Sequence, residues 1–131
     1  MNNKQEYVLG IALSADRRKI LLIRKLSPEW QRGLLNGIGG KIELGETAMQ
    51  AMIREFKEET GVTTFVDQWS SLGHIESDVF KVFVFCSFDD FIFQAKTMEK
   101  EVVDIFTVDI PMLEQCGVDN LHKLVDLAIA L

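Results

Sequence analysis

The chain has 131 residues, of which 47% are hydrophobic and 26% charged, and its formal net charge is −6. This length and composition exclude a disordered chain and predict a single globular domain over residues 1–131. The net negative charge and the lack of a stripe of basic residues argue against duplex nucleic acid as a partner. No apolar run approaches the roughly 20 residues that a membrane span needs.

The cysteines and the start of the chain predict a cytoplasmic protein. The opening MNNKQEYVLG has neither the basic region nor the long apolar region of a secretory signal. Cys86 and Cys116 lie in apolar contexts without CxxC spacing. We therefore expect two reduced, small core residues and neither a disulfide nor a metal site. The sequence gives no signal for the oligomeric state.

The N-terminal third predicts a β-hairpin followed by a loop. Segments 7–14 and 19–25 are apolar strands that the polar turn ADRR separates. Residues 26–35 form a loop that contains Trp30. Residues 36–45 contain four glycines, so we expect a glycine-rich turn that lets the backbone approach a ligand closely.

A helix follows, with signals at both ends. Thr47 is a good N-cap, and Gln50 completes a capping box. Gly61 suits the left-handed position after the last turn. The expected buried stripe, at helical spacing, is Met49, Met52, Ile53 and Phe56.

The rest of the chain adds strands and two helices. Segments 69–77 and 79–88 predict a strand pair, and segment 101–109 predicts another strand. Pro111 opens a short helix, and Asp119 opens a final helix. Its expected inner face is Leu121, Leu124, Val125, Ala128 and Leu131. Strands with helices before and after them predict an α/β fold with a sheet that is covered on both sides.

Three glutamates of the first helix suggest a metal site. Glu55, Glu58 and Glu59 are spaced to lie on one side of the helix. On an arbitrary helix this would be a solvated acidic face. Here the glutamates follow a glycine-rich segment, and Arg54 is placed four residues before Glu58, where it can orient that carboxylate. Clustered carboxylate oxygens suit Mg²⁺ or Mn²⁺, which accept substrate phosphates as further ligands.

The same spacing resembles the signature of a known family. Residues 40–62 are similar to the Nudix box at every defined position, and the order of elements resembles the Nudix α/β/α sandwich with a mixed central sheet. The matching residues are Gly40, Glu46, Arg54, Glu55, Phe56, Glu58, Glu59, Gly61 and Val62. The resemblance implies metal-dependent hydrolysis of a nucleoside diphosphate linked to another group, with water attacking phosphorus.

Carried over by position, the resemblance assigns roles within the box. Glu55, Glu58 and Glu59 would bind the metal, and one of them could help to deprotonate the attacking water. Arg54 would hold the glutamates, and Glu46 would brace the preceding loop onto the helix.

Further roles follow from the same resemblance. The Gly39 carbonyl would be another metal ligand, and Lys41 would contact phosphate. Family members often add a distant acidic residue from a later loop. Glu101 is the candidate here, with Glu99 as the alternative.

The substrate side resembles the MutT-like branch, which sanitises oxidised purine nucleoside triphosphates. In that branch an asparagine at the place of Asn36 reads the base, and an acidic pair after a late IP element, here Asp119 and Asn120, also faces it. Asp119 could instead be a helix N-cap. Trp30 could stack on the base or simply pack. The aromatic residue that flanks the acidic pair in that branch is absent here.

These features predict hydrolysis of a (deoxy)nucleoside triphosphate to monophosphate and pyrophosphate. Two alternatives stay open. One is hydrolysis of another diphosphate, such as a nucleotide sugar or a dinucleotide. The other is a Nudix-like module that senses a nucleotide without catalysis. Such modules usually lose a box glutamate, and this chain keeps all of them.

Overall fold

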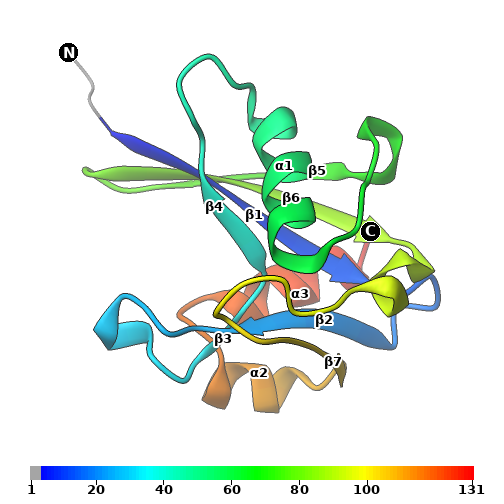
Figure 1. The fold of residues 1–131 in the computed structure, drawn as a ribbon. Coiled ribbons are helices and arrows are strands. Elements are labelled where there is room, and N and C mark those ends of the chain that lie inside the picture. The colour runs from blue at the N-terminus through cyan, green and yellow to red at the C-terminus, as the bar shows by residue number, and fades with distance from the viewer. Residues whose placement is uncertain (1–3) are drawn as a thin grey trace.

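The structure of the protein is a computed structural model that describes residues 4–131. Within that range, seven strands form one mixed sheet in the order β3-β2-β1-β6-β5, with β4 paired to β1 and β7 to β2. Helix α1 covers one face, and α2 and α3 cover the other (Figure 1). The predicted α/β/α sandwich with a mixed sheet is confirmed. The bounds are β1 Gln5–Leu13, β2 Lys19–Arg24, β3 Leu35–Asn36, β4 Ile38–Lys41, α1 Ala48–Thr60, β5 Ser70–Glu76, β6 Phe80–Phe88, β7 Val103–Thr107, α2 Ile110–Cys116 and α3 Leu121–Ile129.

Strand β1 organises the sheet. It pairs in parallel with β6 along its whole length, from Gln5 opposite Phe80 to Leu13 opposite Phe88. It pairs antiparallel with β2, as the hairpin signal predicts, and with β4. Helices α1 and α3 pack on opposite faces of the sheet over this strand, so its residues from Val8 to Leu13 are buried or half-buried on both faces, which explains its continuous apolar run.

The core has one layer on each side of the sheet. On one side, Phe56 of α1 packs edge-on against Trp69 and Phe91, with ring centroids 5.3 Å apart in both pairs. Met52 is also fully buried there, while Met49 and Ile53 are partly buried. The predicted stripe of α1 therefore faces the core.

The predicted ends of α1 are confirmed. The Thr47 hydroxyl accepts a hydrogen bond from the Gln50 backbone N–H (3.1 Å), and the Gln50 side chain accepts one from the Thr47 N–H (2.9 Å). Gly61 ends the helix with φ 78°. Both caps involve residues at most four apart, so sequence alone is enough to find them.

Most of the glycine-rich segment is strand, and only its end forms a turn as predicted, where Gly45 has φ 84° and the Glu46 N–H donates to the Glu43 carbonyl (3.0 Å). Gly39 lies in β4, and a Cβ at that position would come 1.9 Å from the Val8 carbonyl oxygen of β1. A Cβ on Gly37 would come 2.5 Å from the Gly10 carbonyl oxygen. These glycines allow one backbone to approach another closely, because no side chain would fit between them.

Three smaller predictions about the C-terminal region are wrong. The N-cap of α3 is Asn120, at φ 71° and without a side-chain capping bond, so Asp119 does not cap it. Leu131 lies beyond the end of α3 and is 59% exposed. Cys116, the last residue of α2, is exposed and is not the expected core residue. Cys86 is buried, and both thiols are free.

Among residues 4–131, no helix is long and apolar enough to cross a membrane.

Candidate active site

Arg54 ties the loop before α1 to the helix. Its Nε donates to Glu46 (2.6 Å), and its Nη2 donates to the other Glu46 oxygen (2.9 Å) and to the Lys41 carbonyl (3.0 Å). The Glu43 backbone N–H donates to the same Glu46 carboxylate (2.9 Å). The hydrogen bond from Arg54 lowers the pKa of Glu46 to about 2, and the same bond raises the pKa of Arg54. Both side chains therefore stay charged, and the loop has a fixed position on the helix.

The remaining amine of Arg54 faces the box carboxylates. Its Nη1 donates to Glu55 (2.9 Å) and to Glu58 (3.2 Å). One guanidinium thus connects three carboxylates. Its planar set of donors suits such an arrangement better than a lysine would.

Glu55 lies in a space that a glycine leaves open. A Cβ on Gly40 would come 2.5 Å from the Cδ and from one oxygen of the Glu55 carboxylate. The Glu55 side chain is only 13% exposed. Burial raises its pKa, Arg54 opposes that shift, and the charges of Glu58 and Glu99 add to it. The carboxylate is therefore held against β4, largely buried and paired with Arg54.

Glu59 faces a second group of acidic residues. Together with Glu99, Lys100 and Glu101 it lines a hollow of about 560 Å³. Burial raises the pKa of Glu59 to about 7, and repulsion from Glu99, Glu55 and Glu101 contributes. The half-buried carboxylate therefore lies beside three other carboxylates, and Lys25 offsets only part of the shift.

The structure separates the two candidates for the distal acidic residue. Glu101 accepts hydrogen bonds from Lys25 Nζ (3.1 Å) and from the Leu26 backbone N–H (2.6 Å), so both of its oxygens have partners. Burial raises its pKa, but these bonds outweigh burial and the net pKa is lowered. Among the described residues, Glu99 has no hydrogen-bond or ion-pair partner. Sequence reasoning did not single out Lys25, whose only signal was its place at the end of a strand.

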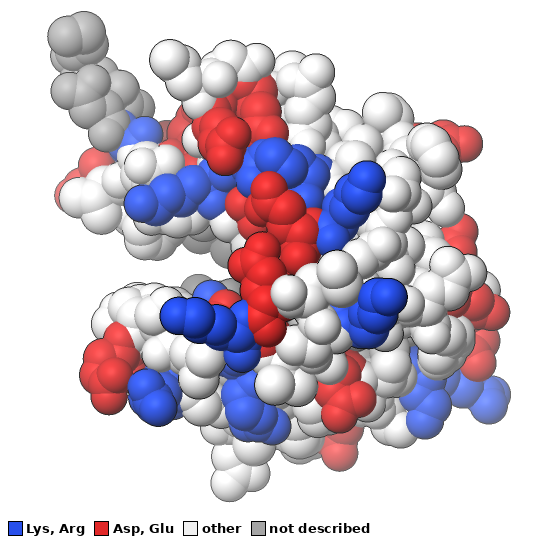
Figure 2. Space-filling model, in the orientation of Figure 1, with Lys and Arg blue, Asp and Glu red and all other residues white. Residues whose placement is uncertain are grey.

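The carboxylate oxygens of Glu55, Glu58 and Glu59 are ligands that fit a divalent cation. Within residues 4–131, no three His, Cys, Asp or Glu side chains already gather as a ready metal site. The reason is visible in the contacts, since Arg54 draws Glu55 and Glu58 toward itself while Glu59 faces Glu99. A cation would relieve the repulsion that raises the pKa of Glu59, and oxygen ligands suit Mg²⁺ or Mn²⁺. Figure 2 shows acidic side chains across the middle of this face, bordered by basic ones and beside a recess.

A second set of predicted residues lies around β3. The Asn36 side-chain oxygen accepts a hydrogen bond from the Gly37 N–H (2.8 Å). The Val118 N–H donates to the Leu35 carbonyl (2.9 Å), which brings the α2–α3 turn next to β3. Exposed Asp119 and Asn120 lie in that turn, so the structure brings these two residues and Asn36 into one region.

The other predicted residues are less closely grouped. Lys41 is exposed at the end of β4, and Gly39 lies two residues before it in the same strand. Trp30 lies in a short 3₁₀ helix, Glu29–Gln31, and is 71% exposed. The alternative that Trp30 is a packing residue is therefore wrong. Among the described residues, no hydrogen bond, ion pair or ring contact connects Trp30 to the carboxylate cluster.

Comparison with known proteins gives consistent results. The NUDIX domain profile matches residues 4–125. The 8-oxo-dGTP diphosphatase of Escherichia coli is 37% identical over 60 residues, which are 46% of each protein. The CTP pyrophosphohydrolase of Escherichia coli is 39% identical over 51 residues, 39% of this chain and 38% of that protein. The matched stretches thus span less than half of these relatives. A solved structure from work on MutT of Aliivibrio salmonicida and Vibrio cholerae has a TM-score of 0.77 and 26% identity, covering 97% of this chain and 99% of that one.

Proposed function

Because this chain belongs to the NUDIX domain family, we propose that it is a pyrophosphohydrolase of nucleoside triphosphates. The products would be a nucleoside monophosphate and pyrophosphate, and the reaction would require Mg²⁺ or Mn²⁺. We further propose that residues 1–131 act as one domain. Two free cysteines support a cytoplasmic location.

One observation carries the proposal. A single guanidinium, that of Arg54, holds Glu55 and Glu58 in place, while Glu59 lies next to them among unbalanced negative charges. Such an arrangement costs folding stability unless a cation joins it. It is therefore better explained as a binding site for metal and phosphate than as a structural feature.

The residues of the site would have distinct roles in metal binding, proton transfer and positioning. Glu55, Glu58, Glu59 and the Gly39 carbonyl would hold the metal. Bound there, it would polarise the phosphoryl oxygens and acidify a water molecule. One of the glutamates would accept the proton of the attacking water, and Arg54 would keep the carboxylates in position.

Two further roles complete the site. We assign the distal acidic role to Glu99, because both oxygens of Glu101 already have protein partners. Glu101 would instead position the loop that carries Glu99. Lys41 would contact the phosphates.

The base would bind between β3 and the α2–α3 turn. Asn36 uses its carbonyl oxygen on Gly37, which leaves its amide N–H groups to donate to a base. Asp119 and Asn120 can supply acceptors and donors on the other side, and exposed Trp30 could stack on the ring. The two relatives act on an oxidised purine triphosphate and on CTP, as their names state. These names support a triphosphate substrate, with an oxidised purine nucleotide and a cytidine nucleotide as the two candidates for the base.

The test is formation of the nucleoside monophosphate from each member of a nucleotide panel in Mg²⁺ or Mn²⁺, with and without excess chelator, because only the triphosphates also release pyrophosphate. The panel contains dGTP, 8-oxo-dGTP, dATP, dCTP, ADP-ribose and a nucleotide sugar. We expect triphosphates to be hydrolysed and chelator to stop the reaction. Hydrolysis of the diphosphate compounds alone would favour the second candidate, another Nudix diphosphate hydrolase. Binding without hydrolysis of any compound would favour a nucleotide sensor.

A further inference from the structure

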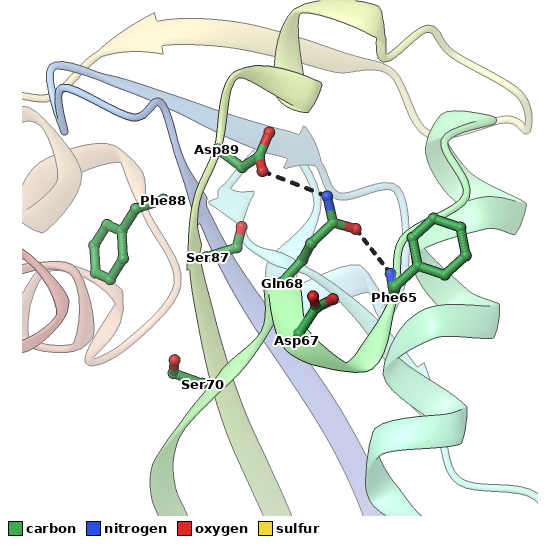
Figure 3. A pocket seen from close by; sticks show the side chains of 7 residues that line it. All are labelled: Phe65, Asp67, Gln68, Ser70, Ser87, Phe88 and Asp89. Atoms are coloured by element: carbon green, nitrogen blue, oxygen red, sulfur yellow. Dashed lines mark hydrogen bonds between the residues drawn. The ribbon is translucent and has the colours of Figure 1, made fainter.

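A second hollow lies at the end of β6, away from the carboxylate cluster. It has a volume of about 530 Å³, which is within the range of small-molecule sites. It shares no lining residue with the carboxylate cluster or with the region around β3. Its lining comes from the segment after α1 and from β5, β6 and the residue that follows β6 (Figure 3): Phe65, Asp67, Gln68, Ser70, Ser87, Phe88 and Asp89.

The floor of this hollow is a hydroxyl without a partner. Ser87 is only 1% exposed, and its Oγ makes no hydrogen bond to any described residue. Phe65, Asp67 and Ser70 are exposed at the rim. In Figure 3 the Ser87 hydroxyl points toward the side chains of Gln68 and Asp89. A buried hydroxyl without a partner costs about 1–3 kcal/mol in a typical protein, so a group from outside the chain is the natural partner.

The hollow has an excess of hydrogen-bond acceptors and of negative charge. Asp67 makes no hydrogen bond or ion pair among the described residues. Asp89 accepts from the Phe91 N–H (2.9 Å) with one oxygen, but its other oxygen has only a long contact with the Gln68 amide (3.4 Å). The Gln68 carbonyl is already used by the Phe65 N–H (2.8 Å). No lysine or arginine lines the hollow.

These contacts exclude several kinds of ligand. An anion would meet two carboxylates and no cation. A purely apolar ligand would leave those carboxylates and the Ser87 hydroxyl without partners. A metal ion would find only two carboxylates in this lining, and one oxygen of Asp89 already accepts a hydrogen bond from the Phe91 N–H.

We propose that this hollow binds an organic cation, a guanidinium or primary ammonium group on a short carbon chain. Its N–H groups donate to Asp67, to the open Asp89 oxygen and to Ser87 Oγ, with Gln68 moving aside. The Phe65 ring, 64% exposed at the rim, covers the carbon chain or the face of the cation. Phe88 does not take this role, because its ring points away from the hollow and already lies under Arg17, 4.2 Å from the ring centroid (Figure 3).

The experiment is a calorimetric or NMR titration of the whole chain. Excess Mg²⁺ is present, so that it neutralises the carboxylate cluster and keeps the cationic probes from binding there. The probes are agmatine, N-acetyl-arginine amide and a short peptide with a central arginine. N-acetyl-citrulline amide, of nearly the same shape but uncharged, is the matched control probe. We expect binding of about millimolar affinity for the cations and none for citrulline. Binding of agmatine alone indicates a free small molecule, and binding of the peptide indicates an arginine side chain of a partner. Both results support the site.

Two variants place the binding in this hollow. Asp67→Asn removes a charge without removing a described hydrogen bond, and we expect affinity to fall about tenfold. Ser87→Ala should weaken binding several-fold while the melting temperature holds or rises, because an unsatisfied buried hydroxyl is gone. Asp126→Asn, at an exposed position on α3, should leave the affinity unchanged.

Three results would overturn the proposal. The first is no binding by any cationic probe, which would mean that a water molecule is the hydrogen-bond partner of the Ser87 hydroxyl. The second is equal binding of arginine and citrulline amides. The third is binding that Glu58→Gln abolishes and Asp67→Asn leaves intact, which would place the cation at the carboxylate cluster.

Discussion

Replacing Gly40 with alanine should damage the candidate active site and leave the fold intact. Gly40 lies in β4 without a positive φ, so its backbone accepts an alanine. The new Cβ would come 2.5 Å from the Cδ of Glu55 and 2.5 and 2.6 Å from its two oxygens. All three atoms belong to the end of one flexible side chain, so Glu55 can move without moving the backbone.

The size of the effect follows from these distances. Ordinary carbon contacts are about 3.5–4 Å, so the carboxylate must move by roughly 1 Å. It would then lose its 2.9 Å hydrogen bond from Arg54. A displacement of about 1 Å at a catalytic group typically costs on the order of 100-fold in rate. The free energy of unfolding should change by less than about 1 kcal/mol, since the lost hydrogen bond is offset by the lower entropy of the unfolded chain.

The neighbouring glycine provides the control. In Gly39→Ala the Cβ would come 1.9 Å from the Val8 carbonyl oxygen, which is backbone and cannot move aside. We expect that variant to lose about 4 kcal/mol or more, or to fail to fold. The measurements are kcat/KM for the best triphosphate, Mg²⁺ affinity and thermal melting. A Gly40→Ala protein with normal activity and normal metal affinity would refute the reasoning, as would one that unfolds like Gly39→Ala.

Four further predictions can be tested in the same assays. Glu58→Gln should lower turnover by about two orders of magnitude or more with an unchanged circular dichroism spectrum, and a near-normal rate would count against the metal site. Glu99→Gln should lower activity with little change in melting temperature, whereas Glu101→Gln should mainly lower the melting temperature; the opposite pattern would reverse their roles. Asn36→Ala should cost about ten- to a hundredfold in kcat/KM and reduce discrimination between dGTP and dCTP, and an equal loss on every substrate would defeat base reading. The folded pKa of Glu46 is depressed from 4.5 to about 2, so its contribution to stability is present above pH 4.5 and is lost as the pH falls toward 2. Acid unfolding of Glu46→Gln should therefore depend less on pH in that window, and an unchanged profile would contradict the prediction.

The features that the sequence determines by itself depend on residues close together in the chain. The caps of α1, its buried stripe and the grouping of Glu55, Glu58 and Glu59 follow from helical periodicity and from hydrogen bonds over three or four residues. The β1–β2 hairpin follows from a short turn between two apolar runs. The Nudix box lies in this local part of the chain, which is why its spacing alone predicts both the family and the position of the carboxylates.

Only the tertiary structure decides what depends on distant residues. Segment 36–45 has the composition of a turn, but residues 38–41 form strand β4, because β1 lies beside them and leaves no room for a side chain at Gly39. The sequence favours Glu101 over Glu99 as the distal acid, but in the structure Lys25 and Leu26, 76 and 75 residues from Glu101, engage both of its oxygens. Ser87 continues an ordinary apolar strand, and only the packing of segment 65–70 against that strand makes it the floor of a hollow. Patterns of neighbouring residues do not predict these outcomes. Each one depends on which residues, distant in the sequence, pack next to the position once the sheet has formed.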